Sequence, residues 1–320
     1  MYFPQRWIFC YAHNGFVQPR PREFDSKLMA SVTADPSVAA RVSAQASPTA
    51  TVRIEPPHGW LELRLADVWE YRELLYFFVW RDIKIRYKQT VVGVLWVVLQ
   101  PLLTMGVFTL FFGRLAKLPS EGLPYPVFYF AALVPWAYFS ASLSTCTNVL
   151  VANQHVITKV YFPRLVLPLA AVCTALLDLT IGFVVMVIIT LAYGYRPGPA
   201  ILLIPLFVLL AQLTALAVGL WTCALNALYR DMAAIVPFVI QFLMLASPVA
   251  YSSTLVPPRW RALYHLNPMA DVIDGFRWSV TGRGHGPGAM IFVAAGMVVL
   301  ILVGGLIFFQ RVEGTVVDRV

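Results

Sequence analysis

The chain has 320 residues, of which 59% are hydrophobic and only 12% charged, and its mean hydropathy is +0.71. Soluble domains carry about 25% charged residues, so this composition excludes an ordinary soluble domain and indicates that lipid is the solvent. A net charge of +8 would suggest nucleic acid as the partner of a soluble protein. In a membrane protein we assign that charge to cytoplasmic loops facing anionic lipid headgroups, and we expect no nucleic-acid partner.

Residues 1–58 differ from the rest of the chain. They are rich in Ala, Ser, Thr and Pro without periodicity, which predicts a disordered cytoplasmic tail. The first 50 residues contain no apolar segment of the kind found in secretory signals. Met29 is followed by Ala-Ser-Val, and one hypothesis is that residues 1–28 are an over-extended start. We interpret all four cysteines as small buried hydrophobic positions, because their spacing fits neither metal ligands nor a redox pair: Cys10, Cys146, Cys173 and Cys223.

Residues 59–90 are predicted to form an amphipathic helix in the membrane interface. Charged side chains occupy the other positions beside an apolar stripe at helical spacing. Trp60, Trp69 and Trp80 suit the headgroup region. A solvated helix packed on a soluble domain is the alternative, but the chain offers no such domain. The stripe consists of Leu61, Leu65, Val68, Leu75, Val79, Ile83 and Tyr87.

Six apolar stretches follow, and they predict an all-α polytopic membrane protein with a six-span domain over residues 91–320. About 20 helical residues cross a ~30 Å hydrocarbon core. The fifth stretch is the weakest, because Pro237, Gln241 and Pro248 interrupt it. A broken helix is tolerated in a membrane where protein covers the freed carbonyls. The stretches are 91–112, 127–151, 166–193, 200–228, 233–251 and 289–309.

The six crossings place both chain ends on the same side of the membrane. A basic cluster, Arg81, Lys84, Arg86 and Lys88, immediately precedes the first stretch. By the positive-inside rule this side is cytoplasmic. The sequence therefore predicts a multi-pass protein of the inner (plasma) membrane with both termini in the cytoplasm.

Residues 252–288 are too polar to span the membrane, and we expect them to form short helices at the outer leaflet. An amphipathic stripe over one short helix supports this expectation, and a disordered loop is the alternative. Asp274 and Arg277 are three residues apart and could pair on the helix surface. The stripe consists of Met269, Val272, Ile273 and Phe276.

Three stretches resemble one family of membrane proteins. They are LLYFFVWRDIKIRYKQTVVGVLWVVLQPLLTMGVFTLFFGRL from residue 74, NQHVITKVYFPRLVLPLA at 153–170 and LNPMADVIDGFRWSVTG at 266–282. The sequence is similar to the permease subunits that export O-antigen, capsule or teichoic acid in the second exporter class of ATP-binding-cassette transporters. The resemblance spans residues 60–313, and the tail has no counterpart in it. It implies a homodimer that works with two cytosolic ATPase subunits and carries a lipid-linked polysaccharide.

The resemblance also implies site residues at both ends of the molecule. A short coupling helix at residues 153–163, together with the interface helix, would contact the ATPase, with small gate helices outside before the last span. The implied ATPase-coupling residues are Asn153, Gln154, Lys159, Tyr161, Arg81 and Asp82. The implied outer-gate residues are Asp271, Asp274, Arg277 and Trp278.

Asp178 and a group of aromatic residues are candidates for the substrate path. An acid inside a span costs ~2.5–3.5 kcal/mol on insertion scales, so Asp178 should face protein or water. It could line the channel or hydrogen bond within the helix packing. Aromatic rings can stack on sugar rings, or they can form an ordinary interfacial belt. The aromatic candidates are Phe128, Tyr129, Trp136, Tyr138 and Tyr251, with Phe130 and Phe139 beside them.

Catalytic motifs are absent from the sequence. The chain has no P-loop, no GxSxG elbow and no HExxH pair, so active transport would need a separate motor, and we expect neither cofactor nor metal. Two alternatives stay open: an exporter of the same architecture for a small molecule or lipid, and an ATP-independent lipid flippase or scramblase. A membrane glycosyltransferase is disfavoured because Asp231 is the single acid in its loop, at 229–232.

Overall fold

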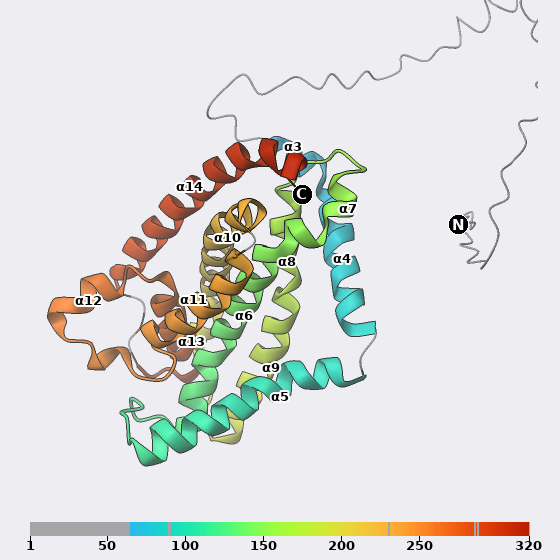
Figure 1. Cartoon of the computed structure of the whole chain (residues 1–320). Helices are drawn as coiled ribbons and strands as arrows, with labels where there is room; N and C mark the ends of the chain where they lie inside the picture. Colours follow the sequence, from blue (N-terminus) through green and yellow to red (C-terminus); the bar gives the residue numbers. More distant parts are fainter. Residues whose placement is uncertain (1–64, 89–90, 230, 285, 287, 320) are drawn as a thin grey trace, which may run out of the picture. The chain divides into compact units, whose positions relative to one another are not determined.

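A computed structural model describes residues 65–88, 91–229, 231–284, 286 and 288–319. The predicted tail, the hypothesis about Met29 and the start of the interface helix lie outside these residues. Every regular element in the described ranges is helical (Figure 1). In chain order they are α3 (Leu65–Glu70), α4 (Arg72–Lys88), α5 (Val91–Phe108), the π-helix η1 (Thr109–Leu115), α6 (Tyr125–Ala152), α7 (Gln154–Ile157), α8 (Val166–Thr174), α9 (Leu176–Ala192), η2 (Pro199–Leu203), α10 (Ile204–Leu228), α11 (Met232–Ala246), η3 (Ser253–Leu255), α12 (Pro258–Tyr264), α13 (Pro268–Thr281) and α14 (Met290–Arg319).

Five helical segments are long and apolar enough to cross a membrane. They correspond to the first, second, third, fourth and sixth stretches predicted from the sequence, and they make the chain an all-α polytopic membrane protein. The third consists of α8 and α9, which meet at Ala175. The segments are Leu95–Leu115, Tyr125–Ala152, Val166–Ala192, Pro199–Leu228 and Met290–Glu313.

The remaining predicted span is shorter than expected. Helix α11 has 15 residues, which at ~1.5 Å per residue reach about 22 Å, less than the ~30 Å hydrocarbon core. It contains Pro237, and its helical conformation ends at Ala246, before Pro248. The sixth crossing therefore stays a prediction.

Helices α6 and α10 form the centre of the bundle. Helices α8, α9 and α13 pack on α6, and α14 packs along α10 (Figure 1). Gly219 of α10 allows close packing on α6, since an added Cβ would lie 2.7 Å from the Cys146 sulfur. Small residues allow such close approach of membrane helices, and polar side chains can join them. The Thr147 hydroxyl donates to that of Thr222 at 2.9 Å, and the Asn226 amide donates to the Thr147 carbonyl at 3.0 Å.

The predicted stripe of the interface helix is seen in α3 and α4. Val68, Leu75 and Val79 are half-buried against the cluster that includes α8, and Phe78 is buried, with its ring centroid 5.7 Å from that of Phe162. The opposite side of α4 exposes aromatic side chains beside basic ones, an arrangement typical of a membrane interface. A position in the interface stays a prediction. The exposed residues include Tyr76, Phe77, Trp80, Lys84 and Lys88.

The cysteine interpretation is confirmed for two residues. Cys146 and Cys223 are buried, whereas Cys173 is half-buried with its sulfur 3.6 Å from the Gln212 side-chain nitrogen. Cys10 lies outside the described residues.

Candidate functional site

The two segments predicted to couple to an ATPase lie side by side. A side-chain nitrogen of Arg81, on α4, donates to the Asn153 amide oxygen at 2.9 Å. Arg81 also pairs with Asp82 at 2.8 Å and stacks its guanidinium 4.7 Å from the Phe78 ring centroid. Three of the six predicted residues therefore form one polar contact that links α4 to the turn between α6 and α7.

The other predicted coupling residues lie just beyond this contact. Gln154 begins α7, and its carbonyl accepts the backbone N–H of Thr158 at 3.0 Å. Lys159 and Tyr161 are exposed, and Tyr161 keeps 61% of its surface accessible. The loop that follows α7 thus presents one cation and one aromatic ring outward, while Asn153, before α7, holds the turn against α4.

A third segment joins this end of the molecule, and the sequence analysis missed it. The backbone N–H of Arg164 donates to the Glu313 carboxylate at 3.1 Å, and the Arg164 guanidinium donates to the Glu313 carbonyl. These bonds tie the loop after α7 to the last turns of α14. Because 149 positions separate the two residues, no local pattern could have revealed the link.

Asp178 lies against the interface helix. Its two carboxylate oxygens accept from the Arg86 guanidinium and the Tyr87 hydroxyl, both at the end of α4. Its side chain is 18% exposed. Among the two readings of this acid, the geometry favours a hydrogen-bonded packing residue; a place in the substrate path stays a prediction.

The aromatic candidates of α6 are packed inside the single chain. Phe128, Tyr129 and Tyr138 are each 1% exposed and Trp136 is 5% exposed. The Tyr138 hydroxyl donates to the Val172 carbonyl at 3.4 Å. In this conformation the four rings pack against neighbouring helices. Their role as a sugar path stays a prediction.

The stripe predicted for the 252–288 segment is confirmed in α13. Met269, Val272, Ile273 and Phe276 are at most 2% exposed and face the helix bundle. The Asn267 side chain caps α13 by accepting from the Met269 N–H at 3.1 Å. Residues 252–288 form η3, α12 and α13, so the alternative of a disordered loop does not hold for the described part of the segment.

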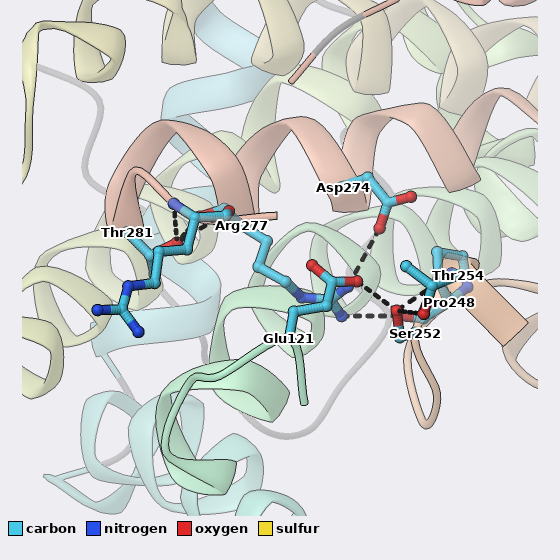
Figure 2. Close-up of polar contacts among 8 residues, drawn as sticks. Glu121, Pro248, Ser252, Thr254, Asp274, Arg277 and Thr281 are labelled. Carbon is cyan, nitrogen blue, oxygen red and sulfur yellow. Dashed lines mark hydrogen bonds and ion pairs between the residues drawn. The ribbon is translucent and has the colours of Figure 1, made fainter. Parts of the chain in front are cut away.

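Arg277 is the most deeply buried charged side chain of the described residues. It pairs with Asp274 at 3.1 Å, so the predicted pair on the helix surface is confirmed (Figure 2). The Arg277 side chain is only 1% exposed, because other parts of the chain cover this face of α13. The guanidinium lies 3.7 Å from the Phe128 ring centroid, where a cation is attracted to the ring face. Burial raises the pKa of Asp274 and lowers that of Arg277. The Asp274 carboxylate therefore depends on Arg277 to stay ionised.

Arg277 also covers the broken end of α11. One of its nitrogens donates to the Pro248 carbonyl at 2.8 Å (Figure 2). The Tyr251 hydroxyl donates to the Ala246 carbonyl at 3.3 Å. A helix that ends among apolar neighbours leaves carbonyls without partners. Tyr251 satisfies one of these at Ala246, and Arg277 satisfies the Pro248 carbonyl in the turn that follows the helix. Tyr251, a predicted path residue, is thus placed at the end of α11.

The loop before α6 contributes residues that the sequence analysis missed. Glu121 accepts from the Ser252 hydroxyl (Figure 2), and the Gly122 carbonyl accepts from Arg283 at 2.9 Å and from the Tyr195 hydroxyl at 3.3 Å. The loops 116–124 and 193–198 therefore meet the 252–288 segment. Glu121 and Gly122 have positive φ angles of 56° and 74°. Gly122, with Pro119 and Pro124 on either side of it, was the available sequence signal of a tight turn.

The last two predicted gate residues lie at the ends of α13. Asp271 receives a hydrogen bond at 2.7 Å from His265, the residue that follows α12. Trp278 is half-buried, and a Cβ added to Gly286 would lie 3.0 Å from its indole ring. All four predicted gate residues therefore belong to α13, but only Asp274 and Arg277 touch one another.

Comparison with known proteins identifies the family. The model of the ABC-2 type transporter family matches residues 73–281, from α4 to the end of α13. The chain belongs to the ABC-2 type transporter family. The match includes the Arg81–Asn153 contact, Asp178 and the buried Arg277 of this ABC-2 transporter.

Several curated relatives of this ABC-2 transporter are named for O-antigen export or polysialic acid transport. It is 32% identical to the O-antigen export system permease protein RfbA of Myxococcus xanthus over 77% of this chain and 95% of that relative. It is 29% identical to an RfbA of Klebsiella pneumoniae over 64% of this chain and 79% of the relative. The polysialic acid transport protein KpsM of Escherichia coli is 20% identical over 73% of this chain and 91% of KpsM.

Proposed function

We propose that this chain is the permease subunit of an ATP-driven exporter that moves a lipid-linked polysaccharide across the inner membrane. The observation that carries the proposal is the match to an O-antigen export permease over 95% of that relative's length. The five long apolar helices provide a membrane domain. In the proposed transporter two copies of the chain form the conduit, and two cytosolic ATPase subunits supply the energy.

The geometry at α7 suggests how the motor is coupled. Lys159 and Tyr161 are exposed, as docking residues must be. Behind them, Arg81 and Asn153 join α7 to α4, and Arg164 joins the same region to α14 through Glu313. A displacement of α7 by the ATPase would therefore be transmitted to the interface helix and to the last span together. In this proposal both chain ends are cytoplasmic.

Co-purification tests the proposal directly. The full chain, extracted from its native membrane in mild detergent, is expected to carry an ATP-binding-cassette ATPase in stoichiometric amount. The double variant Lys159→Glu/Tyr161→Ala should lose most of the ATPase and the surface polysaccharide, because a docking cation is reversed and a ring removed. The matched control, Lys117→Glu/Tyr193→Ala, changes an exposed lysine and an exposed tyrosine in the 116–124 loop and directly after α9.

Two results would count against the proposal. If the folded chain reproducibly carries no ATPase, an ATP-independent lipid flippase becomes the better interpretation. If the Lys159→Glu/Tyr161→Ala variant binds the ATPase as well as the control does, the assignment of α7 as the coupling helix fails, although the exporter itself could stand.

A further inference from the structure

A cavity of ≈ 180 Å³ lies within the 252–288 segment and is bordered by the start of α14. A single water needs only about 10–15 Å³, so the cavity has room for much more than one water. Helix α12, helix α13, η3 and the residues before α14 all contribute walls. It shares Asp274 with the Arg277 cluster, whose other contacts are with Phe128 and with the Pro248 carbonyl after α11.

Asp271, one of the residues that line the cavity, has a buried polar atom without a partner among the described residues. Asp271 uses one carboxylate oxygen to accept from His265 at 2.7 Å. The other, Oδ2, is buried and has no hydrogen-bond partner among the described residues, and the whole side chain is only 10% exposed. A buried carboxylate oxygen without a donor costs free energy. Asp271 lines the cavity, and a ligand hydroxyl that reached this oxygen after a small rotation of the side chain would satisfy it.

The lining indicates which chemical class fits. Arg261 and His265 offer N–H donors, and Asp271 and Asp274 offer acceptors. A hydroxyl group of a ligand can act as both donor and acceptor, so it could pair with either set. Two carboxylates disfavour an anion. A metal ion is disfavoured because no group of three or more metal-binding side chains occurs in the described ranges. Neutral polyhydroxyl compounds match this mixture of donors and acceptors.

The apolar part of the wall suits a sugar ring rather than a flexible polyol. Tyr264 presents a ring, and Met290 and Ile291 present aliphatic groups. A pyranose has the same two-sided character, with C–H groups on its faces and hydroxyls around its edge. Ligand sites typically combine such an apolar surface with a few fixed polar groups.

We propose that this cavity, which we call the α12–α13 cavity, binds one pyranose residue of the exported polysaccharide, with Asp271 Oδ2 accepting a sugar hydroxyl. The inference rests on the proposed function for the identity of the polymer. The presence of the cavity and its lining residues come from the structure alone. A bound sugar would bridge α12, α13 and the start of α14, and so link the polymer to the last membrane helix.

Saturation-transfer NMR on the full chain in lipid nanodiscs tests the site. The probes are the methyl glycosides of a hexose, an N-acetylhexosamine, a 6-deoxyhexose and a uronic acid, and empty nanodiscs give the background. At least one probe should bind to the parent protein. Asp271→Asn keeps the shape and the acceptor for His265 but can place an N–H₂ donor at the free position. It should weaken binding roughly tenfold.

A glycine on the cavity wall allows a matched blocking variant. Gly288 lines the cavity, and an added Cβ there meets no atom within 4 Å, so Gly288→Leu should fill the site without forcing the backbone apart. Gly198 also has open space around an added Cβ, and it is no part of the cavity lining. Binding is expected to disappear in Gly288→Leu and to persist in Gly198→Leu, with equal elution and thermal unfolding of the two variants.

The outcomes separate this inference from the proposed function. Absence of binding by every probe would overturn the sugar site, as would binding that survives in Gly288→Leu, because the sugar would then lie elsewhere. If the ATPase co-purifies but no sugar binds, only the cavity assignment fails. If a sugar binds but no ATPase is found, the motor-driven exporter fails and the site stands.

Discussion

At the scale of single residues, Arg277 carries the largest expected energetic effect. Arg277→Met removes the ion pair with Asp274, the contact with the Phe128 ring and the donor to the Pro248 carbonyl. Removing one partner of a buried ion pair costs roughly 3–5 kcal/mol, because the other charge is left buried and unpaired. The free energy of unfolding, measured in mixed detergent micelles, should fall by that amount.

A double variant tests the cause of that loss. Asp274→Leu/Arg277→Met removes both charges and should recover part of the stability lost in Arg277→Met. Arg259→Met, at an exposed position of α12, should change little. A double variant no more stable than Arg277→Met would contradict the view that the isolated Asp274 causes the loss.

Asp271 predicts a pH dependence of stability. Burial, the largest influence, raises the pKa of Asp271 above 3.8, although His265 opposes the shift. A carboxyl whose folded-state pKa is raised binds more protons in the folded than in the unfolded state. Its contribution to stability is therefore present below about pH 4 and is lost as pH rises through the raised pKa.

The thermal unfolding temperature measured across this range reports the effect. Asp274 acts in the same direction, since burial raises its pKa as well. Asp271→Asn should reduce the decline in stability with rising pH, and Asp271→Asn/Asp274→Asn should reduce it further. A decline of equal slope in the parent and in the double variant would assign the pH dependence to other groups.

At the scale of elements, the end of α4 is attached to α9 through Asp178. Arg86 and Tyr87 both bond to this carboxylate, so Asp178→Ala should loosen the last turn of α4. Because Arg86 is partly exposed, the expected change is modest, about fivefold lower hydrogen-exchange protection of the α4 amides. Asp178→Asn keeps an acceptor for Tyr87 and should lose less.

Export activity separates a packing role of Asp178 from a functional one. If Asp178→Asn exports at the parental rate, no charge is required there, and the residue serves to hold α4. If export fails while α4 stays protected, the packing explanation is wrong and a place of Asp178 in the substrate path becomes the better account.

The sequence could predict those elements whose signal is local. The stripe of α13 repeats at helical spacing, and all four of its members are buried. The interruption of the fifth stretch was visible at Pro248, and α11 ends two residues earlier. The ion pair between Asp274 and Arg277 could also be predicted, from their separation of three positions in the sequence. The burial of this pair could not be predicted from the sequence, because the atoms that cover Arg277 belong to Phe128 and Pro248, which lie in other segments of the chain.

The same reason explains the other misses. Glu121, Glu313 and the α12–α13 cavity are built from segments that meet only after folding. The coupling residues were reached through a family resemblance. The geometry added that Arg81 and Asn153 are in contact, which no spacing in the sequence indicates.

At the scale of the whole molecule, contacts divide the loops into two groups. Hydrogen bonds join the 116–124 loop to Ser252 and Arg283, both in the 252–288 segment. Others join α4 to Asn153 and the loop after α7 to Glu313. Alternating crossings produce such a division, with the first group on the outer face and the second in the cytoplasm in the proposed transporter.

The weakest element of this topology is α11, and its crossing can be measured. Tyr229 precedes α11 and is 60% exposed, and Leu255 follows it and is 49% exposed. If α11 crosses the membrane, a cysteine in Tyr229→Cys should react with a membrane-impermeant maleimide only after permeabilisation, and one in Leu255→Cys should react in intact spheroplasts. The buried Cys146 and Cys223 should react little, and the parent protein gives the background. Equal labelling of both variants from one side would show that α11 returns to the face it entered from. The chain would then have five crossings, and its termini would lie on opposite sides of the membrane.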